Sequence, residues 1–184
     1  MIITLGGHLG SGKSTLGKKL AEIFGYKQYS TGTFMREMAG ERGISLLELA
    51  KEAEIDGGII DHILDDRQKK IGLTEDNFII DGRLAFHFIP HAIKIFLQVD
   101  SHEAAKRIFN DSTRNSVIES HFDIEDAANN INIRRKSEDE RYMKYYGIHI
   151  YDMNFYNIVI DTTGKTPDEV LDEALGRIHL FKNK

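Results

Sequence analysis

The sequence predicts an α/β fold of three layers, in which helices cover both faces of a five-stranded parallel sheet. Five short apolar runs recur along the 184-residue chain, and longer amphipathic segments separate them. The runs are continuously apolar rather than alternating, which is typical of parallel strands that are buried on both faces. In a sheet of this kind, ligands bind at the carboxyl ends of the strands.

The expected elements follow from these runs and from the residues that begin and end helices. We expect strands at Ile2–Leu5, Tyr26–Tyr29, Asn77–Ile80, Ile93–Val99 and Asn157–Ile160. We expect helices at Lys13–Phe24, Phe34–Arg42, Leu46–Ala53, Ile59–Lys70, His102–Asn110, Ile124–Tyr146 and Asp168–Phe181. The last helix should begin at Thr166 as its N-cap, with Pro167 in the first turn, because both residues are favoured there.

The composition indicates one globular domain and excludes several classes of protein. Hydrophobic residues make up 41% of the chain and charged residues 29%, which suits a single core with a polar surface. The net charge of −5 is opposite to that of a general nucleic-acid binder. No apolar run approaches the ~20 residues that span a bilayer, and the absence of cysteine excludes disulfides. We expect a monomeric cytoplasmic protein with no leader and no nucleic-acid or membrane partner.

A glycine-rich motif lies between the first apolar run and the first helical segment. Residues 7–14 read GHLGSGKS and match G-x-x-x-x-G-K-[ST], the phosphate-binding P-loop. Its glycines let backbone amides point at polyphosphate oxygens, and the helix N-terminus adds partial positive charge. We therefore expect a P-loop NTPase fold that binds ATP through Gly7, Gly10, Ser11, Gly12, Lys13, Ser14 and Thr15.

Two side chains of the motif have expected chemical roles. Lys13 should reach the β- and γ-phosphates, and Ser14 should offer its hydroxyl to Mg²⁺. Asp81, at the end of the third apolar run, is a second candidate for the magnesium site, because it could orient the ion through water. A structural role for Asp81, such as a hydrogen bond to the P-loop serine, is the alternative. The expected cofactors are ATP and Mg²⁺.

Four further segments resemble one family of P-loop proteins. Residues 30–43, 60–68, 81–85 and 134–148 read STGTFMREMAGERG, IDHILDDRQ, DGRLA and RRKSEDERYMKYYGI. In sequence and spacing they are similar to motifs of the nucleoside monophosphate kinases, in particular the compact cytidylate kinases of the archaeal type. The resemblance covers nearly the whole chain. It implies that ATP phosphorylates a small-molecule nucleoside monophosphate (NMP), with CMP or dCMP as the expected acceptor.

The resemblance also implies how the single domain is divided. The core would comprise residues 1–30, 74–110 and 147–184. Residues 31–73 would form a helical NMP-binding insert, and residues 111–146 a lid and the helix that follows it. Long segments beside a phosphate site commonly bind the substrate and exclude water. Segments that only cover the sheet are the alternative.

The family pattern places acceptor-binding side chains at Thr31, Arg36 and Arg83. Guanidinium groups suit this task, because their planar forks bind a phosphate dianion and they stay charged. Arg83 follows the third strand and is expected beside the P-loop, where it would be catalytic together with Lys13. Ordinary surface ion pairs are the alternative for both arginines.

Three charged residues of the long seventh helical segment share one face. Arg134, Glu138 and Arg141 are spaced by four and three residues. In the resembling kinases the arginines of this pattern clamp the phosphates, so both are expected to be catalytic, and the acid approaches the acceptor ribose. A solvated helix with ion pairs one turn apart is the alternative. Arg107 matches the position that flanks the ATP base, with an exposed helix arginine as its alternative.

Some positions depart from the family pattern. Thr33 stands where many relatives carry an acid, and Asp111 stands where a second arginine is common, for which Arg114 could compensate. The polar region 112–130 matches the family poorly. The identity of the acceptor is therefore left open. AMP, a non-nucleotide alcohol, or a non-catalytic role as an ATP-binding sensor are the alternatives to CMP.

The histidines form no metal-binding pattern. His87 and His91 lie four residues apart, but Pro90 intervenes and no H-E-x-x-H motif surrounds them. His8, at a variable position of the P-loop, is expected to face solvent. The tyrosines and phenylalanine between residues 142 and 156 are expected to pack as core rather than to stack on a nucleobase.

Overall fold

A computed structural model of the chain describes residues 1–44, 46–111 and 123–183. Its centre is a five-stranded parallel sheet in the order β2-β3-β1-β4-β5, which confirms the predicted fold class. The strands are β1 (Ile2–Gly7), β2 (Lys27–Ser30), β3 (Phe78–Asp81), β4 (Ile93–Gln98) and β5 (Ile158–Asp161). All six residues of the central strand β1 are buried. The carboxyl end of β1 therefore lies between those of β3 and β4.

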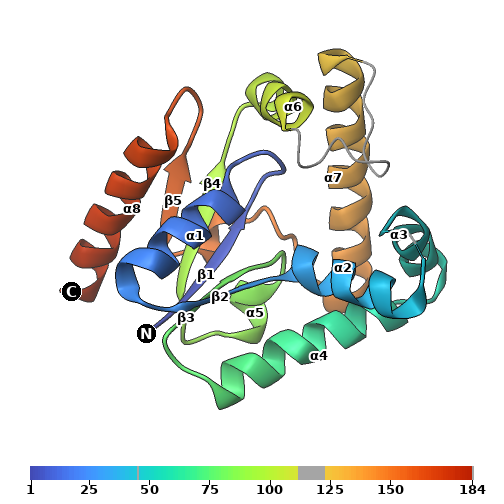
Figure 1. The fold of residues 1–184 in the computed structure, drawn as a ribbon, viewed down its shortest axis with the longest axis horizontal. Helices are drawn as coiled ribbons and strands as arrows, with labels where there is room; N and C mark the ends of the chain where they lie inside the picture. Colours follow the sequence, from blue (N-terminus) through green and yellow to red (C-terminus); the bar gives the residue numbers. More distant parts are fainter. Residues whose placement is uncertain (45, 112–122, 184) are drawn as a thin grey trace.

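Helices surround the sheet, as Figure 1 shows. They are α1 (Lys13–Phe24), α2 (Thr31–Arg42), α3 (Leu46–Ile55), α4 (Ile59–Thr74), α5 (Ala85–Phe88), α6 (Ser101–Asn110), α7 (Ile124–Tyr146), α8 (Pro167–Lys182) and the 3₁₀ helix η1 (Met153–Phe155). None of these described helices has the length and hydropathy that a membrane span requires.

Two apolar cores hold the layers together. On one face of the sheet, α1 and α8 pack on strand residues that include Ile3 and Leu5. On the other face, α4 and α5 pack on Phe78 and Ile80, and the same cluster continues into α2 and α3. The three helices between β2 and β3 thus gather at one side of the sheet, next to the lower part of α7 (Figure 1). This arrangement places α7 beside the segment that is expected to be an insert.

Several elements differ from the sequence-based expectation at their ends. β1 runs two residues further than predicted, because Gly6 and Gly7 pair with Phe96 and Leu97 of β4. α2 begins at Thr31 rather than Phe34, since the segment that follows Ser30 enters the helix without an intervening turn. The short elements α5 and η1 were not predicted. Each has only one turn, which is too short to show a hydrophobic period.

Gly7 and Gly12 need glycine for different reasons. Gly7 has a φ of +137°, and a Cβ at this position would lie 2.2 Å from the carbonyl oxygen of Leu97. Gly12 caps the N-terminus of α1 with a φ of +86°, yet a Cβ there would meet no atom within 4 Å. The close approach of β4 therefore excludes side chains at Gly7, while Gly12 is limited only by its left-handed backbone.

The ends of α8 and α7 are fixed by their capping residues. Thr166 is the N-cap of α8 and Pro167 lies in its first turn, as the sequence predicted, and Thr166 and Glu169 also form a reciprocal capping box. Gly147 ends α7 in the left-handed conformation. Beyond it, Ile148 and Ile150 join Leu84, Phe86 and Tyr142 in a further apolar cluster, against which Tyr146, Tyr151 and Tyr156 also pack. The prediction of aromatic core residues is confirmed for these four tyrosines and wrong for Phe155, which is 40% exposed because it lies in the surface turn η1.

Candidate active site

The P-loop connects the carboxyl end of β1 with the N-terminus of α1. The Nζ of Lys13 donates hydrogen bonds to the carbonyl oxygens of Gly7, at 3.1 Å, and His8, at 2.6 Å. Ser11 is 1% exposed, and its hydroxyl has no hydrogen-bond partner within the described ranges. The loop therefore holds an ammonium group over its own backbone at the positive end of a helix, which is the arrangement that binds a polyphosphate.

The serine that follows Lys13 pairs with the end of the neighbouring strand. The Ser14 hydroxyl donates to Asp81 at 2.8 Å, and the Ser30 hydroxyl donates to the same carboxylate oxygen at 3.4 Å. The hydrogen bond to the P-loop serine that the sequence offers as the alternative for Asp81 is thus present, and a role of Asp81 toward Mg²⁺ stays a prediction. A hydroxyl and a carboxylate are also hard oxygen ligands, so the two groups fit Mg²⁺. Within the described residues, no group of three or more His, Asp or Glu side chains offers another metal site.

Arg83 lies beside the P-loop, where the sequence placed it. Its Nη1 donates to the carbonyl oxygen of Gly7 at 2.8 Å, and its Nε lies 2.8 Å from a carboxylate oxygen of Glu138 on α7. The two side chains are only 16% and 15% exposed. Burial disfavours the charged guanidinium, but Glu138 together with Tyr151 and Tyr142 outweighs this effect, so the pKa of Arg83 is raised. The pair fixes the guanidinium plane next to the P-loop.

One turn further along α7, a second ion pair connects this helix with α4. The Nε of Arg141 lies 3.0 Å from Asp61, whose side chain is 9% exposed. Burial raises the pKa of Asp61, and the nearby Arg141 opposes this shift. Of the three charged residues predicted on one face of α7, the structure brings Glu138 and Arg141 into the polar region between α7, β3 and α4. Arg134 is exposed on the same helix.

The remaining acceptor candidates lie at the start of α2. The Thr31 hydroxyl donates to the backbone oxygen of Asp81 at 3.4 Å, so the first residue of α2 is held at the end of β3. Arg36 is exposed and donates to the Thr33 hydroxyl at 2.9 Å. Thr33 therefore contacts the arginine that the family pattern assigns to the acceptor phosphate. Arg114 lies outside the described residues.

Arg107 is anchored rather than free on its helix. Its Nε pairs with Glu103 at 2.9 Å, and its Nη atoms donate to the hydroxyl and the carbonyl oxygen of Thr162 at 3.1 and 2.7 Å. A longer contact of 3.4 Å reaches the carbonyl oxygen of Lys165. These contacts hold the loop between β5 and α8 against α6. The alternative of a simple exposed arginine is wrong, while a contact with the ATP base stays a prediction.

His8 does not face solvent, so that expectation was wrong. It is half-buried, its Nδ1 lies 3.1 Å from the carbonyl oxygen of Val99, and its ring meets Phe96 edge-on at 5.3 Å. Burial lowers the pKa of His8. The end of β4 passes directly beside the P-loop, which a motif read from the sequence alone does not reveal. His8 also lies against Tyr151, with 5.6 Å between ring centroids.

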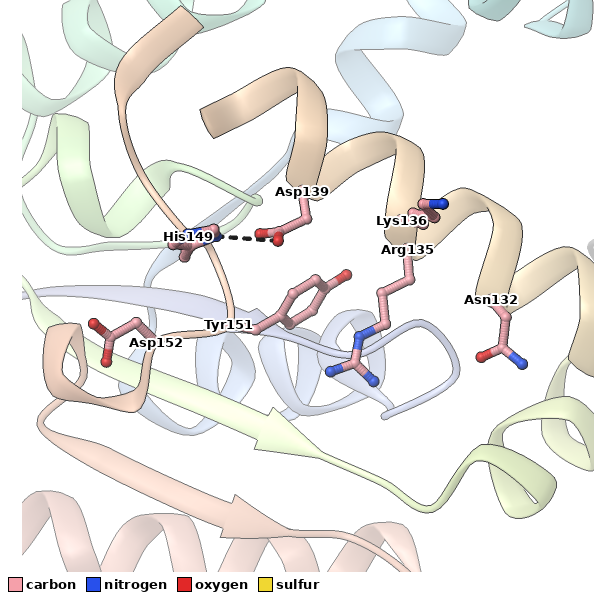
Figure 2. A pocket seen from close by; sticks show the side chains of 7 residues that line it. All are labelled: Asn132, Arg135, Lys136, Asp139, His149, Tyr151 and Asp152. Atoms are coloured by element: carbon pink, nitrogen blue, oxygen red, sulfur yellow. Dashed lines mark hydrogen bonds and ion pairs between the residues drawn. The ribbon is translucent and has the colours of Figure 1, made fainter. Parts of the chain in front are cut away.

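Tyr151 lines a cavity of about 530 Å³ on a different face of α7 from the one that carries Glu138. Figure 2 shows Arg135 extending from α7 over the Tyr151 ring, with 4.4 Å from guanidinium to ring centroid, and His149 paired with Asp139 at 3.1 Å. Because Tyr151 also touches His8, α7 is connected to the P-loop through this face as well as through Arg83.

Sequence reasoning assigned no functional role to four residues that complete the polar region between α4 and α7. Asp61, Asp65 and Gln68 lie on one face of α4 and are 7%, 5% and 2% exposed, and Tyr146 of α7 donates to Asp65. The signal was present, because the three α4 residues are spaced by four and three. Polar residues at that spacing are usually a solvated face, and only the packing of α7 on α4 shows that these are buried.

Comparison with solved structures supports the fold. A shikimate kinase from Bacteroides thetaiotaomicron has a TM-score of 0.66 at 12% identity and covers 97% of this chain and 98% of that chain. A shikimate kinase from Acinetobacter baumannii, in complex with shikimate, has a TM-score of 0.61 at 16% identity and covers 100% of this chain and 95% of that chain. Identities this low show a shared fold alone.

Sequence relatives are considerably more similar. A cytidylate kinase of Thermoplasma volcanium is 36% identical over 188 aligned positions, which cover 100% of this chain and 94% of the relative. A cytidylate kinase of Methanothermobacter thermautotrophicus is 38% identical over 162 positions, which cover 88% and 95%. The model of the cytidylate kinase-like family matches residues 2–164. With its P-loop, its parallel sheet and these relatives, the chain belongs to the cytidylate kinase-like family.

Proposed function

We propose that this protein transfers the γ-phosphoryl group of ATP to CMP or dCMP, giving ADP and the nucleoside diphosphate. The chain belongs to the cytidylate kinase-like family, and the relatives from Thermoplasma volcanium and Methanothermobacter thermautotrophicus are cytidylate kinases. The observation that carries the proposal is the contact of Arg83 with the Gly7 carbonyl oxygen at 2.8 Å. Arg83, which follows β3, is thereby fixed at the loop that would hold the triphosphate, so the acceptor phosphate can be brought next to the triphosphate.

The proposed donor site is the P-loop. Backbone amides of Gly10, Ser11 and Gly12 and the ammonium of Lys13 would hold the β- and γ-phosphates of ATP. Ser14 and Asp81, 2.8 Å apart, would hold Mg²⁺, directly or through water. Bound Mg²⁺ neutralises charge on the β- and γ-phosphates. Gly7 and Thr15 complete the loop at either end, and Arg107 would border the base.

The proposed acceptor site lies between α2, β3 and α7. Arg36 and Arg83 would bind the acceptor phosphate, and Thr31 would border it at the end of β3. Arg134 and Arg141 would neutralise the transferring group, while Glu138 orients Arg83 and borders the acceptor ribose. A phosphate acceptor needs little general-base assistance, because its oxygen is already anionic. The absence of an acid at Thr33 is consistent with this.

The proposed division of the chain follows the same logic. Helices α2–α4 would form the NMP-binding insert of residues 31–73, and residues 111–146 the lid with α7. Closure of both over the P-loop would exclude water, which would otherwise compete with the acceptor for the γ-phosphoryl group. A monomeric cytoplasmic enzyme remains the expectation, and gel filtration of the purified protein tests its oligomeric state.

The test is a coupled assay of ADP release with CMP, dCMP, UMP, AMP and shikimate as acceptors. We expect the highest kcat/KM with CMP or dCMP. Shikimate or AMP as the best acceptor would assign the protein to a different kinase activity. ATP binding without acceptor-dependent ADP release from any of them would indicate a nucleotide sensor.

A pair of arginine variants tests whether Arg83 binds the acceptor rather than ATP. Arg83→Ala should raise the KM for CMP and lower kcat, with ATP affinity near normal, because Arg83 is assigned to the acceptor. Arg42→Ala is the matched control, since Arg42 is 40% exposed and pairs only peripherally with Glu52 at 3.2 Å. Loss of ATP binding with unchanged acceptor affinity in the Arg83 variant would contradict the assignment.

A further inference from the structure

The α4 helix carries a buried polar face that points into the proposed acceptor site. Asp61, Asp65 and Gln68 are spaced by one turn each and are 7%, 5% and 2% exposed. A helix that needed only to pack would carry apolar residues at such positions, because burying polar groups is unfavourable unless they are hydrogen-bonded. Three of them in a row on an element beside the acceptor site suggest a binding role.

Gln68 lies where the elements of the proposed acceptor site converge. A Cβ built on Gly82 would lie 2.7 Å from the Gln68 Oε1 and 2.9 Å from the Thr31 side chain. The amide oxygen of Gln68 is therefore next to the residue that precedes Arg83 and next to the first residue of α2. Gln68 thus lies near two of the residues between which the acceptor site is proposed, Thr31 and Arg83.

The amide of Gln68 is fixed in one orientation. Its Nε2 donates to the Oδ1 of Asp65 at 3.0 Å, and the other Asp65 oxygen accepts from Tyr146. An ionised carboxylate can only accept hydrogen bonds, so the Gln68 amide must turn its NH₂ toward Asp65 and its oxygen away. Burial raises the pKa of Asp65 to about 6, which leaves it mainly ionised above neutral pH.

The oxygen presented in this way has no hydrogen-bond partner within the described residues. Buried polar atoms in folded proteins are nearly always hydrogen-bonded, and an exception calls for an explanation. A ligand that donates a hydrogen bond at this point would satisfy it. Among pyrimidines, cytosine carries an exocyclic amino group, which is a donor, where uracil carries a carbonyl oxygen, which is an acceptor.

We propose that Gln68 selects the acceptor base: its Oε1, held in position by Asp65, accepts a hydrogen bond from the exocyclic amino group of cytosine and disfavours the carbonyl of uracil. Gln68 is thus a specificity-determining residue, and Asp65 is the positioning residue that prevents the amide from flipping. This inference rests on the proposed NMP kinase activity. With UMP, the Gln68 Oε1 and the uracil carbonyl oxygen would face each other as two acceptors with no proton between them. This repulsion would lower kcat/KM for UMP relative to CMP by roughly 10- to 100-fold.

The variants follow from the two assigned roles. Gln68→Met keeps the size of the side chain and removes the acceptor, so it should lower kcat/KM for CMP about tenfold or more and leave UMP nearly unaffected. In Asp65→Asn the introduced amide can pair with either orientation of the Gln68 amide, because its oxygen accepts from the Gln68 NH₂ and its NH₂ donates to the Gln68 oxygen. The Gln68 amide can therefore turn its NH₂ to the base. That variant should gain activity with UMP as it loses activity with CMP. Asp66→Asn is the control on the same helix, because Asp66 is 74% exposed.

A measurement on the unaltered protein supplements the variants in case they fold poorly. N4,N4-dimethyl-CMP lacks the amino hydrogens, whereas 5-methyl-CMP retains them. We expect the kcat/KM of the dimethyl compound to be about tenfold or more below that of the 5-methyl compound. Equal kcat/KM values for the two compounds would overturn this inference and leave the proposed function standing. The same holds if folded Gln68→Met and Asp65→Asn have the same ratio of kcat/KM for CMP to kcat/KM for UMP as Asp66→Asn. Failure of the unaltered protein to phosphorylate any NMP would overturn the proposed function as well.

Discussion

The ion pair between Arg83 and Glu138 connects β3 to α7 across the proposed active site. Its closest N–O distance is 2.8 Å, a second contact measures 3.4 Å, and the two side chains are 16% and 15% exposed. The perturbation is a double-mutant cycle with Arg83→Met and Glu138→Gln. Each single variant leaves the partner charge largely desolvated, whereas the double variant removes both charges.

The expected magnitude follows from the burial of the pair. Breaking a fully buried pair on one side lowers the free energy of unfolding by about 3–5 kcal/mol, and a charged hydrogen bond contributes about 1.5–3 kcal/mol. Because both side chains retain some exposure, we expect each single variant to lose about 2–3 kcal/mol. The double variant should lose no more than either single one, which corresponds to a coupling energy of about 2 kcal/mol.

Urea unfolding, followed by circular dichroism, measures all four proteins. The control cycle uses Lys136 and Glu140 on α7, which are 3.8 Å apart and 79% and 69% exposed. Their coupling energy should stay below about 0.5 kcal/mol, as is usual for exposed pairs. A coupling between Arg83 and Glu138 as small as that of the control pair would refute the conclusion that this pair holds α7 against β3.

Three further outcomes can be measured on single variants. Lys13→Ala should lower kcat about 10²- to 10³-fold in the ADP-release assay, because it removes a positive charge from the γ-phosphate site; a smaller loss would contradict the role given to Lys13. Thr166→Ala should lower the free energy of unfolding by about 1 kcal/mol in urea, since it breaks the capping box with Glu169; an unchanged midpoint would show that the cap contributes nothing. The pKa of Asp65 rises on folding from 3.8 to about 6, so the folded state binds more protons than the unfolded state between these values, and stability should fall as the pH rises through them. In Asp65→Asn that fall should shrink by up to about 3 kcal/mol, measured by urea unfolding at pH 4 and pH 7; an unchanged pH dependence would argue against burial of the ionised carboxylate.

Much of the fold was predictable because its signals are local. The P-loop, the apolar strands and the capping residues each lie within a few neighbouring positions, so α1 and α7 were predicted with the bounds that the structure has. β1 was predicted too short, because glycine disfavours strands and the sequence does not show that Gly6 and Gly7 pair with β4. Long-range pairing decided that end of the strand.

The sequence predicted which residues belong to the candidate site better than it predicted which of them contact one another. Arg83 was expected beside the P-loop and lies there, but its partner Glu138 is 55 residues away, and nothing local links the two. Asp61 and Asp65 stand in a segment that matched the family pattern, yet their burial depends on α7 packing on α4. The half-buried position of His8 likewise depends on where β4 ends.

The two unlike glycines of the P-loop bear on how mutational data for this enzyme are to be understood. At Gly7 even a methyl group would collide with the backbone of β4, at 2.2 Å from an oxygen, whereas at Gly12 the space is open. In a saturation library, substitutions at Gly7 should disappear from the soluble fraction whatever nucleotide is supplied. Those at Gly12, above all Asn, should survive as folded protein with weakened affinity for ATP. Gly7 thus serves the architecture of the sheet, whereas substitutions at Gly12 report on phosphate binding.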